Sequence, residues 1–165
     1  VSLYSAFAVL YSFQMRNLLK GVGQQMKWSV RDESLHSKMG CQLFRHMCSQ
    51  IPGLKEECKE HVYDAALTMH NAEMTYISKL FEMGDIEGIT EYDLKHFIKK
   101  RTGDKIQELG YKAEGKFKFE YDQKSIDKMA WFDHLTGGHT HTDFFAIRPT
   151  DYSKAGEGED FEDVW

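Results

Sequence analysis

Residues 28–36 read Trp-Ser-Val-Arg-Asp-Glu-Ser-Leu-His, and this stretch decides the fold that we predict. Glu33 and His36 are three residues apart, so on a helix they share one face. The other members of that face are mostly apolar: Met26, Val30, Ser37, Gly40, Phe44 and Met47. The pattern therefore predicts that a carboxylate and an imidazole project from the buried side of a helix.

A buried carboxylate is costly unless a partner compensates its charge. Three uses would offset the cost at Glu33: an ion pair, a hydrogen-bond network or a bound metal. A Glu-x-x-His pair pointing into a bundle is the ligand pattern of di-metal carboxylate proteins, where the oxygen and the nitrogen reach one ion together. In that case Asp32 would accept a hydrogen bond from a ligand imidazole and fix its tautomer, and Arg31 would balance the charge of the aspartate. The spacing alone leaves all three uses open.

Helical periodicity covers most of the chain, and we expect an all-α fold. Apolar residues recur at helical spacing in five segments: 1–20, 24–49, 54–83, 90–109 and 125–135. Pro52 stops the second segment, and Thr90 with Asp93 three residues later indicates a capped helix start. The alternation of aromatic residues over 117–121 predicts a short extended piece. Long helices with short connections indicate a bundle.

The chain has 165 residues and a formal net charge of −5, and this acidity is confined to its end. Residues 151–165 hold six acids and one base, whereas the first 150 residues hold 20 acids and 20 bases. An acidic segment that contains glycine and lacks periodicity is typical of a disordered interaction tail. We therefore expect a helical domain at residues 1–138 and a flexible tail at residues 139–165.

The composition excludes several classes of protein. No apolar run reaches the roughly 20 residues of a membrane helix, and the apolar start has no basic leader of a signal peptide. No basic patch indicates nucleic acid as a partner. Three cysteines without regular spacing argue against a disulfide framework or a zinc site. They read as core thiols in a reducing, cytoplasmic compartment.

Other polar pairs are weaker candidates for a site. Glu57 with His61 and His70 with Glu73 have helical spacing, and we interpret both pairs as solvated helix faces. The His-Thr-His run at 139–141 is flanked by glycine and is interpreted as a polar hinge.

The run Arg31-Asp32-Glu33-x-x-His36 resembles the second metal-ligand motif of class I ribonucleotide reductase small subunits. Residues 1–8 are similar to the helix that precedes this motif in the family. Four later stretches resemble the tail of one bacterial and phage branch: 131–133, 142–145, 148–154 and 160–165. Ala146 and Ile147 depart from that branch, which often has an acid between the Phe pair and the Arg.

The resemblance implies a ferritin-like helical bundle and a role for each matched residue. Glu33 and His36 would bind one ion of a di-metal centre that uses O2 as oxidant. Two irons are the first expectation, with a manganese–iron or a two-manganese pair as alternatives. Asp32 and Arg31 would support the ligands without binding the metal. Leu3 and Phe7 would line the pocket that keeps water away from the radical.

The resemblance also implies partners. Tyr152 would pass the radical equivalent to the large (alpha) subunit, where ribonucleotides are reduced to deoxyribonucleotides. Phe161 and Trp165 would anchor the tail in a groove on that subunit. The remaining metal ligands belong to the first half of the family, so we expect a complementary amino-terminal part upstream of Val1. We also expect a homodimer of the complete small subunit.

Three other functions are compatible with parts of the sequence. Another ferritin-like di-metal oxidase would explain the Glu-x-x-His pair but has no use for a docking tail. A non-catalytic orphan fragment would bind the large subunit through the tail and take up no metal. A helical bundle with surface ion pairs and no metal would require Glu33 to be exposed.

Overall fold

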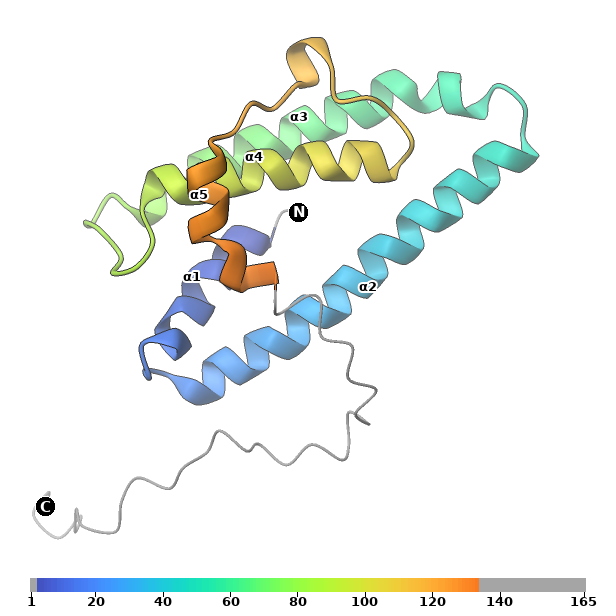
Figure 1. Cartoon of the computed structure of the whole chain (residues 1–165). Helices are drawn as coiled ribbons and strands as arrows, with labels where there is room; N and C mark the ends of the chain where they lie inside the picture. The colour runs from blue at the N-terminus through green and yellow to red at the C-terminus, as the bar shows by residue number, and fades with distance from the viewer. Residues whose placement is uncertain (1–2, 134–165) are drawn as a thin grey trace, which may run out of the picture.

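The computed structural model describes residues 3–133, and their regular structure is helical, as predicted. Four long helices and three short ones follow one another along the chain: α1 (Tyr4–Met15), α2 (Lys20–Gln50), α3 (Leu54–Leu80), α4 (Glu91–Glu108), η1 (Gly115–Phe117), α5 (Gln123–Lys128) and η2 (Ala130–Phe132). In Figure 1, α3 and α4 lie side by side, and α2 runs diagonally from α1 to the start of α3. The short helix α5 crosses α4 on the side that faces α1.

The junction between the first two helices differs from the prediction. We expected one helix to residue 20 and a second from residue 24, but α1 ends at Met15 and α2 begins at Lys20. Asn17 and Leu19 adopt positive φ angles of 65° and 46°, which break the helical path. Gly23 lies inside α2, where a Cβ would collide with the Gln14 side chain of α1. This glycine therefore lets α2 approach α1 closely.

The later boundaries follow the turn signals in the sequence. Thr90 caps α4 as predicted: the Asp93 backbone N–H donates to Thr90 Oγ1 at 3.1 Å. Helix α3 ends at Leu80, three residues before the predicted end, and Gly84 follows in a left-handed conformation with φ 115°. The predicted extended piece at 117–121 holds in part: η1 (Gly115–Phe117) takes its first residue, Lys118 has an extended backbone, and no strand forms within residues 3–133.

Two hydrophobic clusters hold the helices together. The larger one joins α1, α2, α3, α4 and η2, and its fully buried members include Val30, Ile77, Leu94 and Phe132. The smaller one lies where α3 and α4 meet the 111–119 segment, and in it Tyr63 stacks on Phe117 with 4.2 Å between the ring centroids. The first half of α2 is thus anchored on α1, while its second half has few neighbours within the described residues.

Candidate metal centre

Glu33 and His36 lie on the same side of α2, as their spacing predicted. The burial expected for them was wrong within this chain: Glu33 is half-buried, and the His36 side chain is 61% exposed. The buried face of α2 carries Val30, Ser34 and Cys41 instead. At 100° per residue, Glu33 lies at the border of that face and His36 lies well beyond it. His36 therefore points away from the core that this chain builds, and Glu33 lies at the edge of that core.

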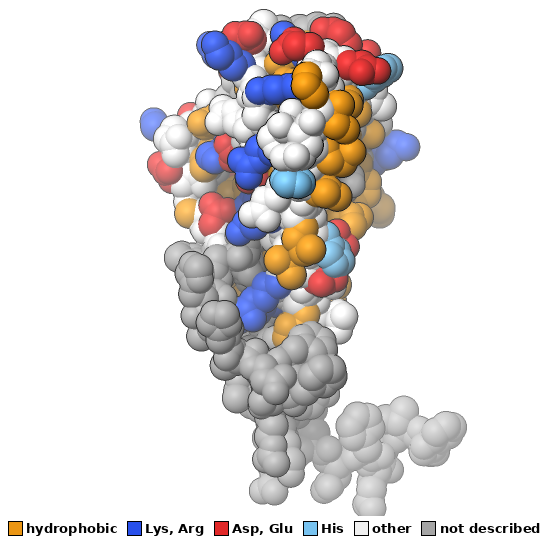
Figure 2. All heavy atoms as spheres, turned by 90° about the vertical axis from the view of Figure 1, so that its right-hand side faces the viewer, with side chains coloured by type: hydrophobic (Ala, Val, Ile, Leu, Met, Phe, Trp, Pro, Cys, Tyr) orange, Lys and Arg blue, Asp and Glu red, His pale blue; other side chains and the backbone are white. Residues whose placement is uncertain are grey.

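An apolar stripe runs along the uncovered side of α2. Its members are strongly exposed: Leu35 at 55%, Met39 at 57%, Leu43 at 60% and Met47 at 44%. Figure 2 views the molecule from this side, with hydrophobic side chains gathered along its length and histidines beside them. We call these four residues the open stripe. Met39, Leu43 and Met47 continue the face of His36 toward the end of the helix.

Asp32 lies next to the candidate ligand His36 on α2. His36 Nε2 is 3.6 Å from Asp32 Oδ1, and both side chains are exposed. Arg31 forms no ion pair with Asp32, and its buried Nε makes no hydrogen bond within residues 3–133. In the part of the chain that the structure describes, no third His, Cys, Asp or Glu joins Glu33 and His36 in a cluster that could hold a metal. The described chain thus offers two donors on an open helix face.

Comparison with known proteins assigns the chain to a family. Residues 1–117 match the family model described as ribonucleotide reductase, small chain. The chain belongs to the ribonucleotide reductase small-chain family. This membership and the all-helical structure agree with the predicted ferritin-like fold class.

Individual relatives of this small-chain family are distant and longer. The probable ribonucleoside-diphosphate reductase small subunit of Invertebrate iridescent virus 3 is 29% identical, over 94% of this chain and 40% of that protein. The corresponding protein of Invertebrate iridescent virus 6 is 26% identical over the whole chain and 51% of its own length. The ribonucleoside-diphosphate reductase subunit beta of Enterobacteria phage T4 is 25% identical over 67% of this chain and 30% of that protein. The chain thus spans about half or less of these relatives.

The residues expected to line the radical pocket fall in different surroundings. Phe7 is buried in the larger cluster, whereas Leu3 precedes α1 and is 49% exposed. Tyr152, Phe161 and Trp165 lie outside the described residues, and so do the boundary at 138 and the 139–141 run. None of the described helices combines the length and the apolarity that a membrane span requires.

The interpretation of His70 and Glu73 as a solvated pair was wrong. Both are buried on α3, with 7% and 5% of their surface exposed. Ser5 on α1 donates a hydrogen bond to the Glu73 carboxylate, and the His70 ring packs against Phe119 with 4.4 Å between ring centroids. Burial raises the pKa of Glu73 although the bond from Ser5 opposes it, and burial together with Lys99 lowers the pKa of His70.

A signal for this burial was present in the sequence. Tyr63, His70 and Ile77 are spaced by seven residues, with Glu73 between the last two, which is the period of a buried helix stripe. Glu57 and His61 are exposed, as predicted.

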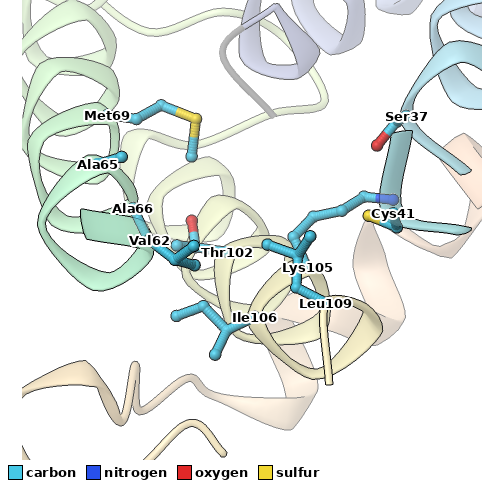
Figure 3. Close-up of a pocket in the computed structure, with 10 residues that line it drawn as sticks. All are labelled: Ser37, Cys41, Val62, Ala65, Ala66, Met69, Thr102, Lys105, Ile106 and Leu109. Atoms are coloured by element: carbon cyan, nitrogen blue, oxygen red, sulfur yellow. The ribbon is translucent and has the colours of Figure 1, made fainter. Parts of the chain in front are cut away.

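A cavity of about 330 Å³ lies between the second half of α2 and the helices α3 and α4. Figure 3 shows Met69 of α3 on one side, Cys41 of α2 on the other, and the Lys105 amino group of α4 beside Cys41. Burial raises the pKa of the Cys41 thiol, and this cysteine is the buried one of the three free thiols. With a largely apolar lining and one cation, the cavity offers no ligand set for a metal.

Proposed function

We propose that this chain forms the part of a ribonucleoside-diphosphate reductase small subunit that supplies Glu33 and His36 to a di-metal centre. The observation that carries the proposal is the position of this pair in a member of the small-chain family. His36 lies on the side of α2 that the core of this chain leaves uncovered, and the half-buried Glu33 lies at the edge of that side. Donors from another segment can reach a ligand pair in that position.

The residue types fit one ion of such a centre. A carboxylate oxygen and a neutral imidazole nitrogen suit iron and manganese. Because Nε2 of His36 faces Asp32 at 3.6 Å, Asp32 would accept a hydrogen bond from Nε2 and leave Nδ1 for the metal. When bound, the metal pair would supply the one-electron oxidant that the reaction needs, with O2 as the source of oxidising power. Two irons, manganese with iron, or two manganese ions are all compatible with these donors.

The remaining donors would come from a complementary amino-terminal part, carried on the same chain or on a second one. The relatives are long enough to contain such a part, since this chain covers 40% and 51% of two of them. Helices that bring the missing donors to Glu33 and His36 would also cover the open stripe. Burial of that apolar surface is favourable by roughly 25 cal/mol per Å². Docking would therefore assemble the ligand set and exclude water from it in one step.

The acidic end of the chain would bind the large subunit. Tyr152 would pass the radical equivalent to that subunit, and Phe161 and Trp165 would insert into its surface as apolar anchors. Residues 151–165 carry six acids and one base, so their charge would steer association with a basic groove. The complete small subunit would act as a homodimer in the cytoplasm, and the product class would be deoxyribonucleotides.

Metal content and low-temperature electron paramagnetic resonance test the proposal. The chain is produced together with the complementary small-subunit part, loaded with Fe(II) without oxygen, and then exposed to air. We expect roughly two metals per complex. The Glu33→Ala variant should lose metal, whereas Glu57→Ala, at an exposed Glu with a His on the next turn of α3, should retain it.

The outcomes separate the competing functions. A radical signal in the metal-loaded pair would place the oxidant on an amino acid, and metal without that signal would indicate an oxidant held on the metals. Absence of metal from the complex would refute the catalytic proposal. If that complex still binds the large subunit, the non-catalytic docking fragment becomes the better account.

A further inference from the structure

Tyr4 connects α1 to the turn of α2 that carries the candidate ligands. The tyrosine is 4% exposed, and its hydroxyl is 2.7 Å from Ser34 Oγ in a buried hydrogen bond. Ser34 directly follows Glu33 and precedes His36 by two residues. Residues 33, 34 and 36 lie on one helical turn and keep fixed angles to one another about the helix axis. The hydrogen bond at Ser34 therefore fixes how that turn is rotated about the axis. Tyr4 therefore limits where Glu33 and His36 can point.

Arg101 of α4 connects the same tyrosine to the end of the described domain. Its guanidinium carbon lies 4.9 Å from the ring centroid of Tyr4, 4.7 Å from that of Phe97 and 5.2 Å from that of Phe132. The side chain is 18% exposed and forms an ion pair with Asp133. A guanidinium withdrawn from water needs such partners: the rings stack on it and the carboxylate pairs with its Nη2 atom, while its buried Nε makes no hydrogen bond within residues 3–133.

These contacts form one continuous path. It runs from Ser34 on α2, through Tyr4 on α1 and Arg101 on α4, to Asp133 directly after η2. Phe132 closes the path on the other side, because its ring centroid lies 5.7 Å from that of Tyr4. We call Tyr4 and Arg101, with the groups they join, the clamp. The clamp lies between the two parts of the molecule that the proposed function requires to act together.

We infer that Tyr4 and Arg101 are positioning residues that hold the ligand-bearing turn of α2 in register with the segment at 130–133. This inference rests on the proposed function, in which the chain beyond Asp133 leads to Tyr152. Transfer between two groups depends steeply on their relative placement, and a misplacement of about 1 Å can cost a hundredfold in rate. Neither residue needs to touch a metal or a radical to have this effect.

The side-chain chemistry of the clamp is specific. A guanidinium is planar and stacks on rings, whereas an ammonium group is a compact point charge that cannot replace it between three aromatic faces. Arg101→Lys therefore keeps the charge and loses the stacking. Tyr4→Phe keeps the ring against Arg101 and loses only the bond to Ser34. The two variants cut the path at different points.

Hydrogen–deuterium exchange on the full chain tests the clamp without metal or activity. In Tyr4→Phe we expect amides of residues 31–37 to exchange about two- to tenfold faster, as expected for loss of one buried hydrogen bond. In Arg101→Lys the faster exchange should appear at residues 129–133. Tyr63→Phe is the matched control for Tyr4. Tyr63 belongs to the smaller cluster, is also 4% exposed, and donates one 2.7 Å hydrogen bond to the backbone oxygen of Lys112.

Turnover provides the second readout. In the assembled reductase, both clamp variants should keep wild-type metal content and wild-type KM for the large subunit while kcat falls about tenfold or more. Tyr63→Phe should leave kcat unchanged, although it should lower the melting temperature about as much as Tyr4→Phe does. Arg16→Lys is the control for the arginine, because Arg16 lies over one ring, that of Phe13, and pairs with an exposed Glu87.

The results distinguish the clamp from the function on which it rests. Unchanged exchange at 31–37 and at 129–133 would overturn the clamp, whatever the activity. If Tyr63→Phe lowers kcat as much as Tyr4→Phe does, Tyr4 contributes only to the overall stability of the fold. That result would also overturn the clamp. Failure of the wild-type complex to bind metal would refute the proposed function. Hydrogen–deuterium exchange at residues 31–37 and 129–133 would still test the clamp in that case.

Discussion

Leu43 lies in the open stripe of α2 with 60% of its surface exposed, and its truncation to alanine separates two accounts of that face. Full burial of a leucine side chain is worth about 1.5–3 kcal/mol. Since 60% of Leu43 is exposed, and alanine retains one carbon, the gain available from a docking partner is about 1 kcal/mol. Leu43→Ala should therefore weaken binding of the complementary small-subunit part about fivefold.

The same substitution should hardly affect the isolated chain. Exposed positions tolerate truncation within about 0.5 kcal/mol, and alanine favours the helix slightly. Isothermal titration calorimetry measures the affinity, and chemical denaturation of the isolated chain measures the stability. Met83→Ala is the control, because Met83 is 99% exposed and lies outside α2. An affinity equal to wild type, or a large loss of stability in the isolated chain, would refute the reasoning.

Three further predictions concern groups that the structure buries. Burial raises the pKa of Glu73, so the folded chain holds a proton that the unfolded chain has lost, and stability should fall as pH rises above the ordinary glutamate value. Glu73→Gln should remove that fall in thermal denaturation from about pH 4 to about pH 7. For Asp93, burial alone would raise the pKa, but hydrogen bonds from Ser125, Thr90 and Lys128 outweigh it and lower the pKa. Its contribution to stability is present above the ordinary aspartate pKa and is lost as pH falls through the lowered value, so Asp93→Asn should flatten the acid limb of the stability curve. Cys41 should react with iodoacetamide more slowly than the half-buried thiols, because it is buried and its pKa is raised; mass spectrometry of the modified chain measures the rates.

Local sequence signals located most of the helices. The cap at Thr90 and the stop at Pro52 act through backbone geometry within a few residues, so the sequence alone predicts them. The break between α1 and α2 was predicted at residues 21–23, but it lies at residues 16–19. Asn17 and Leu19 carry the positive φ angles there, and a leucine rarely adopts that conformation, so the local sequence did not place the break at these residues.

The candidate site divides in the same way. The identity and spacing of Glu33 and His36, and hence the family motif, were evident in the sequence, because a three-residue separation puts both on one side of any helix. Which side of α2 this chain buries was decided by its partners: α1 covers the face of Val30 and Ser34, and the face of His36 stays open. The burial of His70 and Glu73, and the path from Ser34 through Tyr4 and Arg101 to Asp133, likewise join residues far apart in the chain. Periodicity fixes which residues share a face, but only the tertiary structure determines what packs against it.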